Sequence, residues 1–457
     1  MAGFNLSLLT KDLRSEPRSG HYFFNFSVAY PLSINKSKHD STNFNLSLFY
    51  GHVGQVHGLD VSGIASAVEG NINGLQIAGL AGVCGEEFNG VQIVGGFSVT
   101  GNRFSGIQLC GGISVSGNTF QGWQTSGLIS VVGNSLRGVQ ATGGLNVVGE
   151  DAVGLQASGL FNVTGNYLRG VQLTGGFNVT GESLEGMQAS LIFNVTGERF
   201  RGIQATGAFN VTGEDHVGLQ AAGGFNVTGD DHDGLQAAGG FNVTGDDYNG
   251  LQAAGGFNVV GDVLSGLQLG TCNIAATSRG AQIGVVNAAG KLDGFQLGLI
   301  NYSIEGSGIP VGLINISKYD GRIKWINWAS NISGINSGMK FTVNNIYSIV
   351  TLGGINFYGD ITESFVYAGF YGVSFPFGRL SLNTDIGYMY LDNEDIFRKR
   401  RGKIDQHITM LRASLNIELS KRFSLIAGGG LGYISDYNTF LSSGEIYPMF
   451  FAGLELF

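Results

Sequence analysis

Acidic residues gather at a recurring turn of the sequence, and they are the residues best suited to chemistry there. They stand at 214–216, 230–233 and 246–247, sixteen positions apart. Stacked carboxylates repel one another, and a bound calcium ion would relieve the repulsion because carboxylate oxygens suit that ion. The calcium-binding nonapeptide pattern is missing, however, and exposed turns often carry acids for solubility alone. We therefore predict no metal and no cofactor, and keep a divalent cation at these turns as the alternative.

Side-chain amides form a second recurring set. An Asn-Val-Thr triplet begins at Asn162, Asn178, Asn194, Asn210, Asn226 and Asn242. The triplet matches the glycosylation acceptor pattern, but it falls inside an expected strand and follows the internal repeat, which favours a structural role. Stacked Gln and Asn side chains bond to the coils above and below. We expect these ladders on the outside or at the corners of the fold, where a flat Asn/Thr face could bind a glycan or ice.

No set of residues predicts catalysis. Lyases and hydrolases built on β-helices need acids and bases that converge in a groove, whereas the repeats carry amides and hydroxyls without a distinctive His, Lys or Arg cluster. Cys84, Cys110 and Cys272 are far apart and odd in number, so they form neither a disulfide framework nor a zinc pattern. We interpret them as small core fillers. The chain is predicted not to be an enzyme, with no catalytic or cofactor-binding residues.

Composition excludes several classes of protein. The chain has 457 residues with 77 Gly, 5 Pro and 43% hydrophobic residues. The glycines do not recur every third residue, which excludes collagen, and the apolar content argues against disorder. A net charge of −9 gives no basic surface for nucleic acid, and we interpret the basic run Arg398–Arg401 as a solvated loop.

Membrane and targeting signals are also missing from the sequence pattern. No apolar run approaches the roughly 18 residues of a membrane-spanning helix. Residues Met1–Ser7 lack the basic start and apolar segment of a signal peptide. We therefore expect either a cytoplasmic chain or a natural start that differs from the one printed.

The elements that must position these residues are internal repeats. A Gly-apolar-Gln triplet recurs every 16 residues from Gly74 to Gly266, and Gly58-Leu59-Asp60 fits one step earlier. The step then shortens to 14, at Gly280, Gly294 and Gly308. The repeat region therefore comprises 14 + 3 = 17 units.

Within each unit, counted from its first Gly, apolar residues fill positions 2, 4, 8 and 10, and often 15. Polar residues fill positions 3, 9 and 11. This alternation predicts strands, and glycines at 6, 7 and 12 mark the bends. Gln140 and Asn146 are six apart, whereas Gln282 and Asn287 of a 14-residue unit are five apart. In one continuous strand that slip would turn Asn to the opposite face, so a bend between them, and hence a two-sided β-solenoid, is favoured over a meander or barrel of repeats.

The predicted organisation is all-β in three parts: a β cap at 1–57, a solenoid at 58–317 and an antiparallel meander or barrel at 318–457. In the solenoid we expect Leu, Ala, Phe and Val to form internal stacks. The last part has alternating strands of outer-membrane length and ends on Phe457. Glu455, two residues earlier, departs from the apolar residue usual there, and a soluble capping sandwich is the alternative.

The repeats resemble a family of bacterial surface-repeat proteins known from leptospires and other Gram-negative groups. The matching motifs are Gly-Leu-Gln-Ala-Ser-Gly-Leu-Phe-Asn-Val at 154–163, Gly-Phe-Gln-Leu-Gly-Leu-Ile-Asn at 294–301 and Gly-Ile-Pro-Val-Gly-Leu-Ile-Asn-Ile at 308–316. The resemblance covers most of 22–316. It implies a location at the cell surface or outer membrane and no known catalytic residues.

We therefore expect a non-catalytic structural or adhesive surface repeat protein of the bacterial cell envelope. Its partners would be the cell envelope or outer membrane, a surface glycan, or a host or neighbouring protein, and no nucleic acid. The alternative is a ligand-binding solenoid that takes a glycan, ice or a divalent metal on its Asn/Thr face or its acidic turns.

Overall fold

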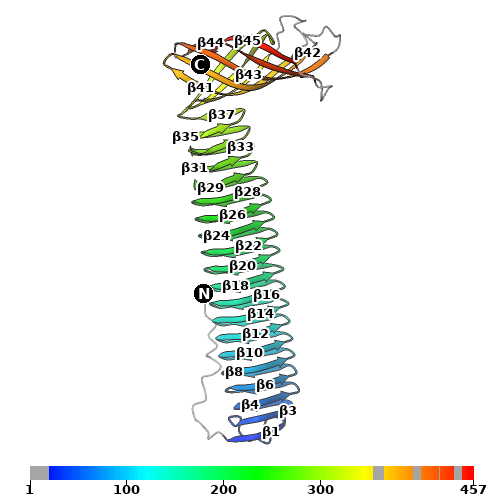
Figure 1. Ribbon diagram of the computed structural model, residues 1–457. Helices are drawn as coiled ribbons and strands as arrows, with labels where there is room; N and C mark the ends of the chain where they lie inside the picture. The colour runs from blue at the N-terminus through cyan, green and yellow to red at the C-terminus, as the bar shows by residue number, and fades with distance from the viewer. Residues whose placement is uncertain (1–19, 354–364, 395–402, 421, 437–444, 457) are drawn as a thin grey trace. The chain divides into compact units, whose positions relative to one another are not determined.

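The computed structural model describes residues 20–353, 365–394, 403–420, 422–436 and 445–456 (Figure 1). Every element within these ranges is a β-strand. Nowhere in the described ranges is there a helix able to span a bilayer. The chain divides into two compact units, Met1–Asp230 and Asp231–Phe457. The basic run Arg398–Arg401 lies outside the described residues.

The first unit is a parallel β-solenoid with two strands in each coil, as the change of repeat length predicted. Gln156 pairs with Gln172 on one face and Asn162 with Asn178 on the other, so each residue meets its equivalent in the next coil. The first strands are β1 (His21–Ala29), β2 (Leu32–Ser33) and β3 (Ser41–Val53). Because β1 pairs in parallel with β3, and β3 with the next coil, parallel pairing reaches back to His21.

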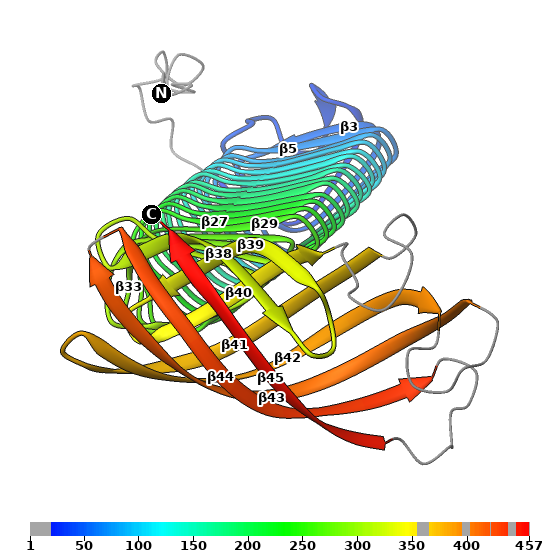
Figure 2. The same ribbon diagram turned by 90° about the horizontal axis from the view of Figure 1, so that it is seen from above.

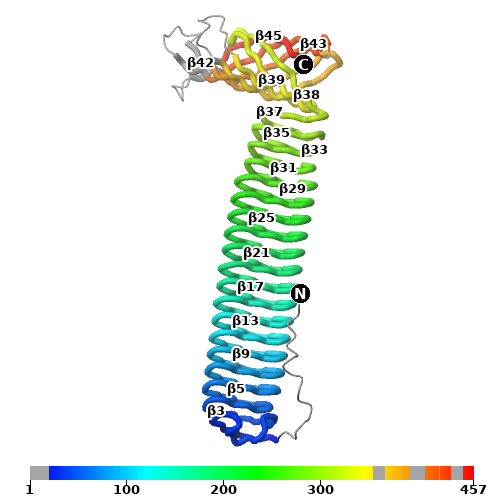
Figure 3. Tube along the Cα trace, turned by 180° about the vertical axis from the view of Figure 1, so that it is seen from behind, coloured from blue at the N-terminus to red at the C-terminus, as the bar shows by residue number. Residues whose placement is uncertain are grey.

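Two faces of strands follow in this unit, and Figure 3 shows their layering from behind. The Gln-bearing strands are β4 (Gln55–Ser62), β6 (Ile72–Ala78), β8 (Phe88–Val94), β10 (Arg103–Cys110), β12 (Thr119–Ser126), β14 (Ser135–Thr142), β16 (Ala152–Ser158), β18 (Leu168–Thr174), β20 (Leu184–Ser190), β22 (Phe200–Thr206) and β24 (His216–Ala222). The opposite face is formed by β5 (Ala65–Val68), β7 (Ala81–Cys84), β9 (Phe97–Thr100), β11 (Ile113–Ser116), β13 (Ile129–Val132), β15 (Leu145–Val148), β17 (Phe161–Thr164), β19 (Phe177–Thr180), β21 (Phe193–Thr196), β23 (Phe209–Thr212) and β25 (Phe225–Thr228).

The first glycine of each repeat is required by backbone geometry. Gly170 has a φ of +141°, and a Cβ there would lie 1.9 Å from the carbonyl oxygen of Gly154 in the preceding coil. Side chains rarely adopt this φ, and this approach leaves no room for one. Gly170 lies between Arg169 and Val171, which alternate outward along β18, and the missing side chain lets successive coils approach closely.

The inward and outward faces are the reverse of the prediction. Gln172, Asn178 and Thr180 are fully buried, whereas the apolar residues that alternate with them are half-buried or exposed, as at Leu173. Leu, Val, Ala and Phe at positions 2, 4, 8 and 10 therefore coat the solenoid, and the Gln and Asn ladders fill it. The prediction was wrong because alternation identifies two faces without saying which one points inward.

Position 15 supplies the most regular part of the apolar core of the first unit, beside buried residues such as Val132 and Val148 at position 11. Position 15 points inward, and its aromatic residues stack: Phe88 on Phe104 at 4.7 Å between ring centroids and Phe104 on Phe120 at 4.9 Å. Leu136, Leu168, Leu184 and Phe200 continue the same buried cluster. These stacked side chains form a buried apolar ridge inside the coils, beside the amide ladders.

The second unit begins with solenoid coils and ends in a closed antiparallel barrel. Its coil strands are β26 (His232–Ala238), β27 (Phe241–Thr244), β28 (Tyr248–Ala254), β29 (Phe257–Leu264), β30 (Leu267–Leu269), β31 (Cys272–Ser278), β32 (Ala281–Ile283), β33 (Val286–Leu292), β34 (Phe295–Leu297), β35 (Ile300–Glu305), β36 (Ile309–Val311) and β37 (Ile314–Ser317). In the 14-residue coils the Gln strand shortens, and the ladder continues without inversion.

The barrel closes by pairing of its first strand with its last. Its strands are β38 (Gly321–Ser330), β39 (Ile335–Val343), β40 (Ile346–Gly353), β41 (Phe365–Phe377), β42 (Leu380–Glu394), β43 (Lys403–Ser420), β44 (Phe423–Asp436) and β45 (Glu445–Leu456), as Figure 2 shows from above. Of the two predicted architectures for 318–457, the barrel is therefore the correct one.

A deletion series tests the coil as the structural unit. Removing residues 170–185 takes out one complete coil and joins Arg169 to Gly186, so that the neighbours meet equivalent partners. We expect a melting temperature within a few degrees of wild type. Removing only 170–177 leaves half a coil with unpaired edges, and we expect loss of cooperative unfolding by circular dichroism. Equal damage from both deletions would contradict the coil as the unit.

Candidate functional site

The Gln residues form a buried ladder in which every amide points the same way. Gln172 Nε2 donates to Gln156 Oε1 at 2.8 Å, and Gln188 Nε2 to Gln172 Oε1 at 2.9 Å. The hydroxyl of Thr164 donates to the same acceptor on Gln156 at 2.8 Å. Each glutamine therefore donates a hydrogen bond to one neighbour and accepts one from the other. These bonds offset most of the free-energy cost of burying a polar group.

The Asn residues form a second ladder of opposite direction. Asn162 Nδ2 donates to Asn178 Oδ1 in the following coil at 2.9 Å, and also to the carbonyl oxygen of Leu173 at 2.8 Å. The flat Asn/Thr face predicted for binding a glycan or ice is therefore not on the surface. The side chains of this face are buried and hydrogen-bonded to neighbouring coils. The prediction of an exposed Asn/Thr face was therefore wrong.

Asp60 ends the Gln ladder and reverses its direction. Its carboxylate accepts Gln76 Nε2 from the following coil at 2.7 Å and Asn45 Nδ2 from the preceding one at 2.7 Å. Ser66 Oγ donates to it as well, at 2.5 Å. Donors arrive from both directions, and an ionised carboxylate offers acceptors only. Burial raises the pKa of Asp60, and the three donors oppose that rise.

The acidic turns are exposed, and two of their carboxylates accept hydrogen bonds from the backbone of the next coil. In the second unit, Asp231 Oδ1 accepts the backbone N–H of Asp247 at 3.0 Å, and Asp247 Oδ1 accepts that of Val263 at 3.0 Å. The carboxylates thus link successive coils. Among the described residues, no group of three or more His, Cys, Asp or Glu side chains is arranged to hold a metal ion.

The histidine within the acidic motif turns inward. His232 stacks on Tyr248 with ring centroids 5.1 Å apart, at the position that Phe and Leu occupy in other coils. Tyr248 Oη donates to the carbonyl oxygen of Gly234 at 3.1 Å. Burial lowers the pKa of His232 to about 4. The imidazole therefore serves as a neutral core ring at neutral pH.

The cysteines also occupy structural positions. Cys84 and Cys110 are buried, and Cys272 is half-buried, all as free thiols. Burial raises the pKa of Cys84 to about 12, so this thiol is a poor nucleophile. The Cys84 and Cys110 side chains each donate to backbone carbonyl oxygens, as core fillers do.

Charged side chains are confined to one edge of the coils. In the first unit from Gly74 onward, every Asp, Glu, Lys and Arg stands at position 13, 14 or 16 of its repeat. These positions surround the turn before each Gln strand. The opposite turn presents apolar residues instead, such as Leu128, Leu160 and Leu191, which is 71% exposed. In other coils this turn carries two glycines, as at Gly111-Gly112 and Gly143-Gly144.

The barrel has an apolar outer wall around a mixed interior, in which buried apolar side chains such as Ile408 and Met410 lie beside charged ones. Its wall carries exposed apolar side chains, while ion pairs lie inside: Arg412 Nε on Asp385 Oδ1 at 2.7 Å and Lys340 Nζ on Glu455 Oε1 at 2.7 Å. Glu455 is fully buried, so its departure from the expected apolar residue reflects an inward-facing position. Sequence analysis missed Asp385, Arg412 and Lys340. Their isolation within otherwise apolar alternating strands was the available signal.

Arg412 is further held by aromatic rings. Its guanidinium lies 3.3 Å from the ring centroid of Phe370 and 4.8 Å from that of Phe451. Asp385 also accepts the hydroxyl of Tyr347 at 2.8 Å. These paired charges and rings lie beside a buried apolar cluster that includes Met389, Ile408 and Met410, and together they fill the barrel interior.

Comparisons with known protein families, curated proteins and solved structures found no match.

Replacing Asp60 tests the reversal of the ladder. Asp60→Asn places an amide donor against either Asn45 or Gln76, and we expect a loss of about 1–3 kcal/mol in the free energy of unfolding. The double variant Asp60→Asn with Gln76→Glu moves the acceptor-only group one coil onward and should recover part of that loss. Chemical denaturation measures both, and an unchanged stability of the single variant would refute the role.

The buried histidine predicts an acid dependence. Because the pKa of His232 is lowered from 6.5 to about 4, its stabilisation is complete above pH 6.5 and is lost as the pH falls towards 4. We expect wild type to lose about 3 kcal/mol more than His232→Phe between pH 7 and pH 4. Parallel pH profiles for the two proteins would contradict this.

Proposed function

We propose that this chain is a non-catalytic repeat protein of the bacterial cell envelope, with its barrel inserted in the outer membrane and its solenoid acting as a structural or adhesive surface. The observation that carries the proposal is the apolar outer wall of the barrel, where large hydrophobic side chains are exposed. Membrane barrels face lipid with such a band of apolar residues. The proposal requires no catalytic residue, cofactor or nucleic acid.

The outer wall supports insertion by its composition and its length. Leu411, Ile446 and Phe450 are 61%, 66% and 66% exposed. Strands β41–β45 have 12 to 18 residues, which exceeds the roughly 9–11 that a tilted strand needs to cross the hydrocarbon. The other three strands, β38–β40, have 10, 9 and 8 residues. In water such a wall would be an aggregation hazard, whereas in lipid the same wall is solvated.

The solenoid supports a display role by its regularity. Its outer faces repeat one pattern of Phe, Val and Leu from coil to coil, with Phe177 stacked on Phe193 at 4.5 Å. Repeated apolar faces beside a charged edge favour contact with an extended partner, such as another envelope protein, a host protein or a surface glycan. A repeated surface of this kind binds by accumulation of weak equivalent contacts.

Lysine substitutions on the wall distinguish insertion from a soluble barrel. With a signal peptide added, the chain expressed in a Gram-negative host should fractionate with the outer membrane and migrate differently when heated. Leu415→Lys and Leu431→Lys place charges where lipid would lie, each costing about 2–4 kcal/mol near mid-membrane, so both should reduce the inserted fraction. In a soluble barrel the same changes would be neutral.

The matched control is Tyr167→Lys, which adds the same charge at an exposed position on the charged edge of the first unit. We expect this variant to insert like wild type. Recovery of the wild-type protein as a soluble periplasmic monomer would refute the proposal.

A further inference from the structure

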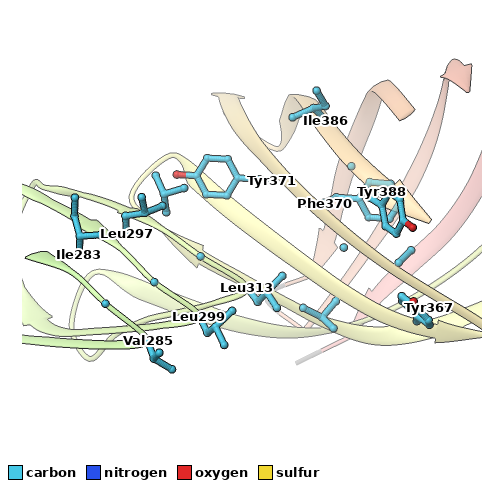
Figure 4. A pocket seen from close by; sticks show the side chains of 18 of the residues that line it. Ile283, Val285, Leu297, Leu299, Leu313, Tyr367, Phe370, Tyr371, Ile386 and Tyr388 are labelled. Atoms are coloured by element: carbon cyan, nitrogen blue, oxygen red, sulfur yellow. The ribbon is translucent and has the colours of Figure 1, made fainter. Parts of the chain in front are cut away.

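An apolar cleft of about 1130 Å³ lies within the second unit, between the last coils and the outer wall of the barrel (Figure 4). We call it the coil–barrel cleft. Its coil side carries Val285, Leu299 and Leu313, and its barrel side carries Tyr367, Ile386 and Tyr388. The volume exceeds the roughly 300–1,000 Å³ usual for small-molecule sites.

The two walls of the cleft are joined by specific bonds. Tyr371 Oη donates to the carbonyl oxygen of Pro310 at 2.9 Å, and Ser348 Oγ donates to that of Leu313 at 2.9 Å. The Asn ladder also ends here, since Asn315 Nδ2 donates to Ser348 Oγ at 3.1 Å. The cleft is therefore bounded by a docked interface.

The chemistry of the lining selects a hydrocarbon. No charged side chain lines the cleft. Of its five hydroxyl residues, Thr271, Tyr371 and Tyr388 are bonded within the protein. A peptide or glycan would bury polar groups without partners, at a cost of about 1–3 kcal/mol each. An alkyl chain requires none, and each methylene buried contributes about 0.8 kcal/mol.

The surroundings of the cleft favour the acyl chain of a phospholipid over a free fatty acid. It offers no cation to pair with the carboxylate of a fatty acid, and it is continuous with the apolar wall through Ile386, which is 58% exposed. We propose that the coil–barrel cleft binds an acyl chain of a membrane phospholipid, whose headgroup remains outside. This site goes beyond the proposed function and does not require the barrel to be inserted.

Gly369 provides a means to fill the cleft. A Cβ added there would meet Leu313 Cδ2 at 3.6 Å and the backbone oxygen of Ile349 at 4.0 Å, which are ordinary contacts. Gly369→Phe should therefore occupy the site without displacing the backbone. Leu299→Asp approaches from the coil side, where Leu299 is 54% exposed, and adds a charge that an acyl chain cannot solvate. Ala452→Phe adds the same ring on the exposed wall outside the cleft and is the matched control.

Native mass spectrometry of the full chain, released from detergent after addition of palmitoyl-oleoyl phosphatidylethanolamine, tests the proposal. We expect one retained phospholipid on wild type and Ala452→Phe, and at least a tenfold lower bound fraction for Gly369→Phe and Leu299→Asp. Equal retention by all four proteins, or no retention by wild type, would overturn it.

Two further outcomes would also overturn it. Retention of added palmitic acid in place of the phospholipid would assign the cleft to free fatty acids. A dimer of the chain that Gly369→Phe abolishes, with lipid retention unaffected, would make the cleft a self-association surface. Binding in a protein that fails to insert would refute only the proposed function, and insertion without lipid retention would refute only this inference.

Discussion

Each coil of this protein depends on a glutamine amide that meets the same amide in the next coil. A buried amide without a partner costs about 1–3 kcal/mol, whereas a ladder of identical amides satisfies every member except those at its ends. When the repeat shortens from 16 to 14 residues, one residue is lost between Gln and Asn and one between Asn and the next Gln, so that both bends shorten and both ladders continue. The amide pairing also explains the strand glycine, since coils must approach closely enough for Gln172 to reach Gln156.

At the ends of the ladders, residues other than Gln and Asn take the ladder positions or accept the last hydrogen bond. Asp60 stands where donors converge from both sides. In the second unit Pro310 takes the Gln position opposite Gln296, so the donor series stops, and the Asn ladder passes to Ser348 of the barrel. The last coils therefore contact the barrel through Ser348 and Tyr371. The coil–barrel cleft lies beside these contacts.

Solenoid coils and barrel both present apolar side chains on the outside. In the coils the interior is filled by amide ladders beside a buried apolar ridge, and in the barrel by a buried apolar cluster together with ion pairs such as that of Arg412 with Asp385. Alternation along each strand places every second side chain outward. Such a surface is stable against lipid or an apolar partner, which is the common basis of both proposals.

The sequence by itself determined the all-β class, the 16- and 14-residue coils and the bend between Gln140 and Asn146, because these follow from spacing alone. Only the tertiary structure decided which face points inward, since Gln172 and Leu173 alternate equally well in either orientation. It also decided that His232 belongs to the core and that Glu455 faces Lys340. These outcomes depend on partners distant in sequence or one coil away, and a period of two carries no information about them.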